Sequence, residues 1–178
     1  MSEQISHDYP TCAITSIDYD QEVINHMRKE CVNPSLRWLR YDIVEDCGIP
    51  QGNELDQDCY FDLIVDKGTF DAILVEGATY TMLADVHRML RVGGVYVIFS
   101  INTKELLEAL LGLPELNFEL VATKMQEGKE IELLQDLLPL EKFKFDGFTV
   151  ITFSFLPDAE RSKKQIMIDV NTFNFFIT

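Results

Sequence analysis

A short run of β-branched and aromatic residues that ends in an aspartate constrains the fold of this chain more than any other feature. Residues 60–66 read Tyr-Phe-Asp-Leu-Ile-Val-Asp, and Lys67-Gly68-Thr69 stops the run. Buried parallel strands have this composition because both of their faces are covered, and ligands of open α/β sheets bind beyond the carboxyl ends of the strands. The run therefore predicts a parallel strand that places Asp66 at a ligand-binding edge.

Two further acidic residues end similar runs. Residues 12–17 lead into Asp18 and residues 36–41 lead into Asp42, so that the three acids are spaced evenly along the sequence. If the three strands are parallel neighbours in one sheet, their carboxylates line one crevice. The acid after the second strand of a nucleotide-binding sheet commonly accepts hydrogen bonds from ribose hydroxyls. A single Asp at a strand end is more simply a turn former, but three on successive strands favour a ligand crevice.

Helical and strand-like segments alternate in the first two thirds of the chain, which is typical of βαβ units and a parallel sheet. Asp20 and Asn102 are predicted helix N-caps, and Gly93-Gly94 is predicted to end the second helix. The predicted helices span residues 21–30, 79–91 and 102–111, and the predicted strands span 12–17, 36–39, 60–66 and 95–100. The fold class that follows is α/β, with a Rossmann-like and mostly parallel sheet.

After residue 115 the pattern changes to strands at 117–125 and 148–156, with a helix at 130–138 between them. Such an arrangement predicts an antiparallel C-terminal edge on the sheet. We therefore expect one domain over residues 1–156 and a tail over 157–178. The tail holds a strand-like segment at 165–170 that could add a strand, and three aromatic residues that could equally dock a partner: Phe173, Phe175 and Phe176.

Composition limits the classes of function. A chain of 178 residues with 47% hydrophobic residues is long and apolar enough to form one globular domain. Its formal net charge of −15 would repel a phosphate backbone, which argues against a nucleic-acid partner. A basic protein surface is a plausible partner, although net acidity also serves solubility alone.

The cysteines and histidines give no metal or redox signal. No Cys-x-x-Cys pair occurs, so we expect the cysteines to be buried, reduced thiols. The histidines lack the spacing of metal ligands, so we read the histidines as structural. The N-terminus is polar and no long apolar run follows, so the sequence predicts a cytoplasmic protein with no membrane segment. The residues concerned are Cys12, Cys31, Cys47, Cys59, His7, His26 and His87.

Three segments together resemble a known family. They are Phe61-Asp-Leu-Ile-Val-Asp-Lys-Gly-Thr-Phe-Asp-Ala72, Thr15-Ser-Ile-Asp-Tyr19 and Met89-Leu-Arg-Val-Gly-Gly-Val-Tyr96. The chain is similar to class I S-adenosylmethionine-dependent methyltransferases of the Asp-Lys-Gly-Thr type, which include lysine methyltransferases that act on elongation factor 1-alpha. The resemblance covers about residues 1–156 and implies S-adenosylmethionine as cofactor and a protein lysine as methyl acceptor.

The resemblance assigns cofactor-binding roles by position. Asp18 matches the acid that holds the ribose of S-adenosylmethionine, and Tyr19 matches the residue beside the adenine. Asp42 matches the acid that reads the adenine amino group, and Ile43 follows it with a backbone N–H directed toward the ring.

A second segment is implied to lie beside the reacting methyl group. Asp66, Lys67, Gly68 and Thr69 match the residues next to the methionine part of the cofactor and the path of the acceptor lysine. Asp66, Lys67 and Thr69 are therefore candidate catalytic residues, while Asp66 and Gly68 also join the cofactor-binding set. Gly68 and Thr69 fit an ordinary strand-to-helix turn equally well. Methyl transfer to a neutral amine depends on orientation and exclusion of water, so no strong base is required.

One departure from the family pattern concerns its glycine-rich loop. Family members begin with a strand and a Gly-x-Gly loop, placed roughly 20 residues before the ribose acid as in the dinucleotide fingerprint. Here the first glycine of any kind is Gly48, and residues 1–9 look like the helix that follows that loop. We therefore expect a fold without its first strand, in which the strands of Asp18 and Asp66 either pair directly or leave a gap.

Three classes of function remain open on the sequence. The first is a protein-lysine methyltransferase with an elongation factor 1-alpha-like substrate, by resemblance. The second is a non-catalytic methyltransferase-like protein that acts through protein interaction, which the missing loop favours. The third is a nicotinamide-dependent dehydrogenase, which needs the same glycine loop and leaves Asp66-Lys67-Gly68-Thr69 unexplained. The sequence does not predict an oligomeric state.

Overall fold

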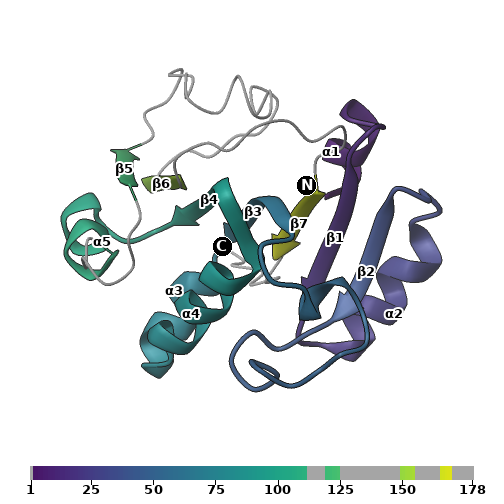
Figure 1. Cartoon of the computed structure of the whole chain (residues 1–178), viewed down its shortest axis with the longest axis horizontal. Helices are drawn as coiled ribbons and strands as arrows, with labels where there is room; N and C mark the ends of the chain where they lie inside the picture. The colour runs from purple at the N-terminus through teal and green to yellow at the C-terminus, as the bar shows by residue number, and fades with distance from the viewer. Residues whose placement is uncertain (1, 112–118, 125–148, 155–164, 170–178) are drawn as a thin grey trace, which may run out of the picture.

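A computed structural model describes residues 2–111, 119–124, 149–154 and 165–169 of the chain (Figure 1). The helices are α1 (Ser2–Asp8), α2 (Gln21–Glu30), α3 (Thr69–Glu76), α4 (Thr79–Met89) and α5 (Lys104–Leu111), with a short 3-10 helix at Glu54–Asp56. The strands are β1 (Ala13–Asp18), β2 (Leu36–Arg40), β3 (Phe61–Lys67), β4 (Leu90–Ser100), β5 (Glu119–Lys124), β6 (Thr149–Ser154) and β7 (Gln165–Asp169).

The described strands form one sheet in the order β2-β1-β7-β3-β4-β6-β5. All neighbouring pairs from β2 to β4 are parallel, whereas β6 pairs antiparallel with both β4 and β5. The predicted α/β class, the mostly parallel sheet and the antiparallel C-terminal edge are therefore confirmed.

The centre of the sheet differs from the expectation. The strands of Asp18 and Asp66 neither pair directly nor leave a gap, because β7 lies between them and pairs in parallel with both (Figure 1). A backbone edge buried without partners costs free energy, and β7 supplies those partners on both sides. The strand-like segment at 165–170 does add a strand to the sheet, and that strand lies at its centre.

Helices cover both faces of this sheet and enclose two apolar clusters. One cluster joins α1 and α2 to alternate residues of the strands and contains Ile5, Ile14, Ile24, Leu36, Trp38, Leu63, Val65, Val95, Val97 and Phe99. The other joins α3, α4 and α5 to the opposite face and contains Ile17, Ile64, Phe70, Met82, Val86, Met89, Tyr96, Ile98, Leu107 and Met167 among others. This alternation along each strand explains why the strands read as continuous apolar runs.

Local sequence explains most helix ends, with one correction. The Asp20 carboxylate accepts a hydrogen bond from the Glu22 N–H at 2.7 Å and caps α2 as predicted. Asn102 does not cap α5; the Thr103 hydroxyl accepts the Leu106 N–H at 3.4 Å instead. The Asn102 amide donates to the Asp71 carboxylate at 2.8 Å, so a tertiary contact takes the side chain that the sequence assigned to a cap.

The predicted end of the second helix was wrong. Helix α4 ends at Met89, and Gly93 and Gly94 lie inside β4 rather than beyond a helix. Gly93 has a φ of 76°, and a Cβ on Gly94 would come within 2.8 Å of the Arg91 carbonyl oxygen. The strand therefore uses these glycines for an irregular step early in its course, where its register with β3 shifts.

The prediction of buried, reduced cysteines holds in part. All four cysteines are free thiols, but only Cys12 is buried and Cys59 is exposed. Within the described residues no cluster of potential ligands could hold a metal ion. No described helix combines the length and hydropathy that a membrane span needs. The predicted helix at 130–138 and the aromatic residues after 172 lie outside the described residues.

Candidate functional site at the carboxyl edge of the sheet

The sheet has a topological switch point at the position of β7. The chain proceeds from β1 outward to β2 on one side, and from β3 outward to β4 on the other. Ligands of open α/β sheets bind at the carboxyl ends of the strands where the order reverses. The predicted site residues therefore belong at the edge formed by the ends of β1, β2, β7 and β3.

Asp18 ends β1 with a carboxylate that is only partly used. Its side chain is 3% exposed, and Oδ1 accepts the Asp20 N–H at 2.8 Å. Oδ2 has no hydrogen-bond partner among the described residues. Burial raises the pKa of this carboxyl, and the hydrogen bond from Asp20 partly opposes the rise. A buried carboxylate oxygen without a donor is unusual and is suited to accept a ligand hydroxyl.

The other residues of the predicted nucleoside end follow the carboxyl ends of β1 and β2. Tyr19 follows Asp18 and is 55% exposed. Asp42 shapes the turn after β2, because Oδ1 accepts the N–H groups of Val44 and Glu45, each at 3.0 Å. Ile43 is 4% exposed and packs in the core on the α3–α5 face. The side chains of Asp42 and Ile43 thus hold the turn in place.

Asp66 lies one residue before the end of β3, and both of its carboxylate oxygens accept hydrogen bonds. It is 1% exposed and accepts the N–H groups of Thr69 and Phe70, each at 3.0 Å, and the Tyr96 hydroxyl at 2.9 Å. Burial raises the pKa of Asp66 to about 7, against the lowering effect of these three donors. The carboxyl therefore accepts the first N–H groups of α3, and its burial works against its ionisation.

The residues after Asp66 form a tight strand-to-helix turn. Gly68 has a φ of 87°, a conformation that residues with a Cβ rarely adopt, and it stands at the N-cap position of α3. Lys67 is exposed, whereas Thr69 is 4% exposed and its hydroxyl has no hydrogen-bond partner among the described residues. Gly68 is thus required by the turn, while Thr69 has a polar group left for another contact.

A second carboxylate, Asp71, ties the end of β4 to α3. It accepts the Ile101 N–H at 2.9 Å and the Asn102 amide at 2.8 Å, and it also accepts the Ser100 hydroxyl. Its negative charge adds to the rise of the pKa of Asp66. Sequence reasoning did not single out Asp71, although Asp71 stands in the quoted Asp-Lys-Gly-Thr segment.

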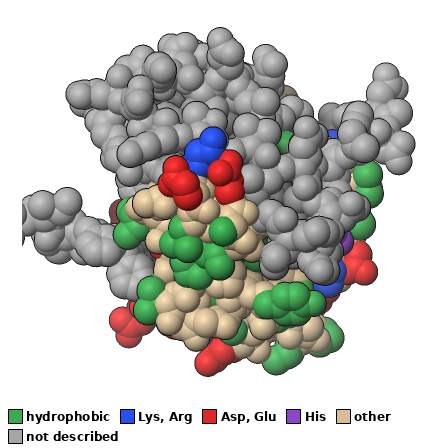
Figure 2. All heavy atoms as spheres, turned by 90° about the vertical axis from the view of Figure 1, so that its left-hand side faces the viewer, with side chains coloured by type: hydrophobic (Ala, Val, Ile, Leu, Met, Phe, Trp, Pro, Cys, Tyr) green, Lys and Arg blue, Asp and Glu red, His purple; other side chains and the backbone are tan. Residues whose placement is uncertain are grey.

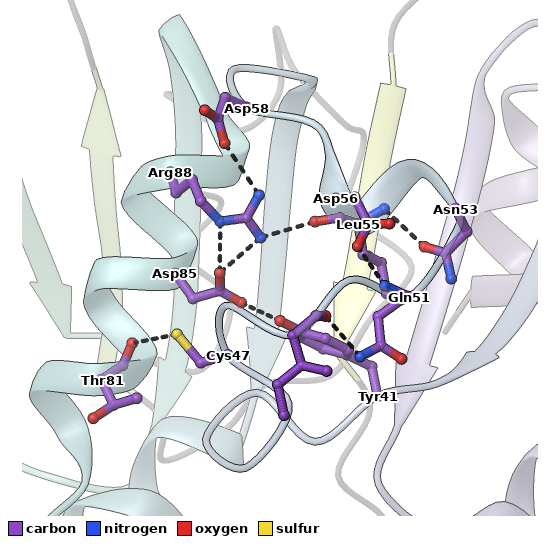
Figure 3. A network of polar contacts seen from close by, with 11 residues as sticks. Tyr41, Cys47, Gln51, Asn53, Leu55, Asp56, Asp58, Thr81, Asp85 and Arg88 are labelled. Atoms are coloured by element: carbon purple, nitrogen blue, oxygen red, sulfur yellow. Dashed lines mark hydrogen bonds and ion pairs between the residues drawn. The ribbon is translucent and has the colours of Figure 1, made fainter.

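Sequence reasoning also missed a buried network that fastens the loop after β2 to α4 (Figure 3). The Tyr41 hydroxyl donates to Asp85 at 2.5 Å, and Arg88 donates to the same carboxylate at 2.9 Å. Arg88 also donates to the Leu55 carbonyl oxygen at 2.8 Å and forms an ion pair with Asp58 at 3.2 Å. The only sequence signal was a pair of charges inside an otherwise apolar helical pattern.

The same loop is held from the other side by Glu54. This carboxylate is 6% exposed, accepts the Thr15 hydroxyl of β1 at 2.9 Å and pairs with Arg37 of β2 at 2.7 Å. Glu54 and Arg88 together fix the segment that begins with Asp42. The position of the nucleoside end thus depends on contacts with β1, β2 and α4.

The structure separates the three predicted acids into two groups. Asp18 and the turn of Asp42 follow the neighbouring strands β1 and β2. Asp66 belongs to β3, which is separated from β1 by β7. In the register of the sheet, Asp169 of β7 stands beside Asp66 on one side and Ile17 on the other. The place between the two groups is therefore held by the end of β7.

Comparisons with known proteins place these features in context. No protein-family profile matches the chain. Over 121 residues the chain is 33% identical to the eEF1A lysine and N-terminal methyltransferase of Homo sapiens; this match covers 63% of the chain and 16% of the relative. The chain thus spans about a sixth of the length of the curated relatives that it matches.

Solved structures share the fold at low sequence identity. A S-adenosylmethionine-dependent methyltransferase of Methanosarcina mazei superposes with a TM-score of 0.54 at 14% identity, covering 86% of this chain and 87% of that one. A TehB-like S-adenosylmethionine-dependent methyltransferase of Corynebacterium glutamicum gives a TM-score of 0.51 at 21% identity, covering 86% of both chains. Both comparisons confirm the α/β fold with a mostly parallel sheet that the sequence predicts.

Proposed function

We propose that this chain, which resembles class I S-adenosylmethionine-dependent methyltransferases in sequence and fold, serves in methylation of a protein lysine, with an elongation factor 1-alpha-like substrate. The similarity to an eEF1A methyltransferase supports the choice of substrate. The net charge of −15 supports attraction to a basic protein. Acidic side chains also lie among the apolar ones on the face shown in Figure 2.

The unpartnered Oδ2 of Asp18 is the observation that carries the proposal. It lies at the end of β1, beside the switch point, and is buried without a donor in the described part of the chain. A ribose hydroxyl donated to this oxygen would satisfy it. The residues present therefore fit the nucleoside end of S-adenosylmethionine, with Asp18 on the ribose and the turn of Asp42 beside the adenine.

The cofactor supplies a methyl group on a sulfonium, and the protein orients the acceptor amine and excludes water from it. Lys67, Gly68 and Thr69 are proposed to border that amine, and the free hydroxyl of Thr69 is available to it. Asp66 already accepts three hydrogen bonds from its own chain. We therefore assign Asp66 a supporting role, in which it fixes the turn that carries Thr69.

A specific observation favours the second candidate, a methyltransferase-like protein without catalysis. Strand β7 holds the centre of the sheet, and neither the strand nor the residues that follow it in sequence, Val170-Asn171-Thr172, include a glycine. A backbone that approaches a cofactor closely needs glycine there, since a Cβ takes the space. This candidate acts through protein interaction alone.

Calorimetric titration of the 178-residue chain with S-adenosylmethionine separates the two candidates. The methyltransferase proposal predicts micromolar or tighter binding, whereas the non-catalytic candidate predicts weaker binding, because the nucleoside end then has no glycine loop beside it. Micromolar or tighter binding would favour the catalytic candidate for the chain as it stands, and would show that the cofactor site does not need the loop.

A chimera that carries a strand and a Gly-x-Gly loop ahead of Met1 tests the site itself, on the proposal that the added strand replaces β7 between β1 and β3. We expect this chimera to bind the cofactor and Asp18→Ala to weaken binding by roughly ten- to a hundredfold, the range for a lost hydrogen bond to a charged group. Glu22→Gln, an exposed carboxylate on α2, is the matched control. If Asp18→Ala and Glu22→Gln bind equally well, Asp18 does not hold the ribose.

Methyl incorporation by the chimera into lysate of the source organism tests the substrate. We expect label on a protein lysine, with elongation factor 1-alpha as the main labelled protein. Labelling at limiting substrate should slow as salt rises, since charge steering is screened beyond about 8 Å at physiological ionic strength. Label on nucleic acid or small molecules alone would contradict the proposed substrate class.

A further inference from the structure

Strand β7 is attached to the molecule differently from the other central strands. Its main neighbours among the described elements are β1 and β3, whereas β1 and β2 also contact α1 and α2, and β3 and β4 also contact α3. The attachment therefore consists mainly of two parallel ladders, Ala13 to Ile17 on one side and Leu63 to Asp66 on the other. Ladder hydrogen bonds depend on the backbone and are available to any parallel strand that enters this position.

Among the described side chains of the chain, Met167 is the one that β7 contributes to the core. Met167 is fully buried in the apolar cluster on the α3–α5 face, at the register of Thr15 on one side and Ile64 on the other. A flexible thioether fills such a space without a rigid shape requirement. The central position thus selects a short parallel strand with an apolar residue at its middle.

The length of chain before β7 does not force it onto its own sheet. Strand β6 ends at Ser154 and β7 begins at Gln165, so ten residues lie between them. Two strands, β4 and β3, stand between β6 and β7 in the sheet, which makes three strand spacings of about 4.8 Å, or about 14 Å. Ten extended residues reach about 33 Å. The connection is therefore longer than the closed arrangement requires, which is the slack that exchange between two chains needs.

We propose that the position between β1 and β3 is an exchangeable strand-binding site, which accepts β7 from a second copy of this chain in place of its own. Exchange of an identical element is a low-cost route to a dimer, because every contact of the closed monomer is reproduced in the pair. The exchanged strand brings Asp169 to the register position beside Asp66 of the partner. Each candidate site in such a dimer is completed by the other copy.

A peptide probe measures the site on the intact chain. A fluorescently labelled peptide of residues 161–172 is added to the full protein, and binding is followed by anisotropy over hours, since the protein's own β7 must leave first. We expect saturable binding, and at least about tenfold weaker binding by the same peptide with Met167→Asp, because burial of a Met side chain is lost. Equal binding of the two peptides, or of a shuffled peptide, overturns the proposal.

Trapping between two full chains tests exchange directly. Chains with Ala13→Cys and chains with Gln165→Cys are mixed, incubated at high concentration and oxidised; the two positions are register partners on adjacent strands. A disulfide-linked heterodimer is expected well above the level given by Ala13→Cys mixed with Glu76→Cys, which places the second thiol on exposed α3. The same yield in both mixtures reflects random collision and overturns the proposal. Neither measurement uses a cofactor, so the outcome is independent of the proposed function.

Discussion

The buried aspartates that end β1 and β3 use their carboxylates in opposite ways. Asp66 accepts two backbone N–H groups of α3 and the Tyr96 hydroxyl, whereas Asp18 accepts one backbone N–H and leaves Oδ2 unpartnered among the described residues. Both are at most 3% exposed. Burial of an acid at a strand end therefore does not by itself indicate a ligand; the number of donors that the fold already provides separates a structural carboxylate from a candidate binding group.

The largest expected effect that tests this contrast is the loss of stability in Asp66→Ala. The substitution leaves three buried donors without an acceptor, each worth about 1–3 kcal/mol, so we expect a loss of about 3–5 kcal/mol in the free energy of unfolding. Asp18→Ala is the matched control and should cost about 1–2 kcal/mol, because it leaves one N–H donor, that of Asp20, without its acceptor. Urea unfolding of both variants measures the difference. Similar losses in the two would show that Asp18 is structural too.

Next in size is the pH dependence that Asp66 imposes. The pKa of Asp66 is about 7 in the folded protein and near its ordinary value of 3.8 in the unfolded chain. Between these values the folded state holds a proton that the unfolded state has released, so stability falls as the pH rises from 4 to 7. The expected fall is on the order of 2–4 kcal/mol. In Asp66→Asn this part of the slope should vanish, and an unchanged slope would assign it to other groups.

The hydrogen-bond network that fastens the loop after β2 to α4 gives a smaller effect on stability. Tyr41, on the Asp18 side, donates to Asp85 of α4, whose carboxylate is held there by Arg88. Tyr41→Phe should lower the free energy of unfolding by about 1–2 kcal/mol, since a buried carboxylate loses one donor. A double-mutant cycle with Asp85→Asn measures the coupling. If the losses of stability in Tyr41→Phe and Asp85→Asn are additive, the two side chains of Figure 3 stabilise the loop independently of each other.

The smallest expected effect concerns the turn after Asp66. Gly68→Ala should cost about 1 kcal/mol, because Gly68 has a φ of 87° although a Cβ there would meet no atom within 4 Å. Lys67→Ala, at the exposed end of β3, is the control and should change stability by less than about 0.5 kcal/mol. If Gly68→Ala is neutral in unfolding experiments, the turn relaxes and does not constrain Thr69.

The fold was predictable where short-range sequence decides structure. The Asp20 cap and the apolar run of β3 depend on a few adjacent residues, and both were found where the sequence put them. Gly93-Gly94 misled the prediction, because the same pair suits a helix end and an irregular strand. The central place of β7 could not be read from sequence, since it depends on pairing between residues 152 positions apart, such as Ala13 and Gln165.

The candidate site was predictable in its residue types and not in its contacts. Aspartates after strand-like runs indicated the carboxyl edge, but the sequence did not reveal that Asp66 would be used by α3 and Tyr96. Asp66 lies two residues before the Gly68 N-cap, outside the usual capping position, so the capping pattern of the sequence did not signal this role. Asp85 and Glu54 carried no such signal, because their partners come from distant segments: Tyr41, Thr15 and Arg37.

The central place of β7 also sets the order of events during synthesis. When a ribosome has made residues 1–111, strands β1 to β4 exist, but the strand that joins β1 to β3 has not yet been translated. At about 5–20 residues per second, several seconds pass before Gln165–Asp169 emerges. During that time both facing edges carry unpaired backbone groups that other strands can bind. Closure of the sheet between β1 and β3 is therefore a late folding step, and wrong pairing at these two edges competes with it until β7 arrives.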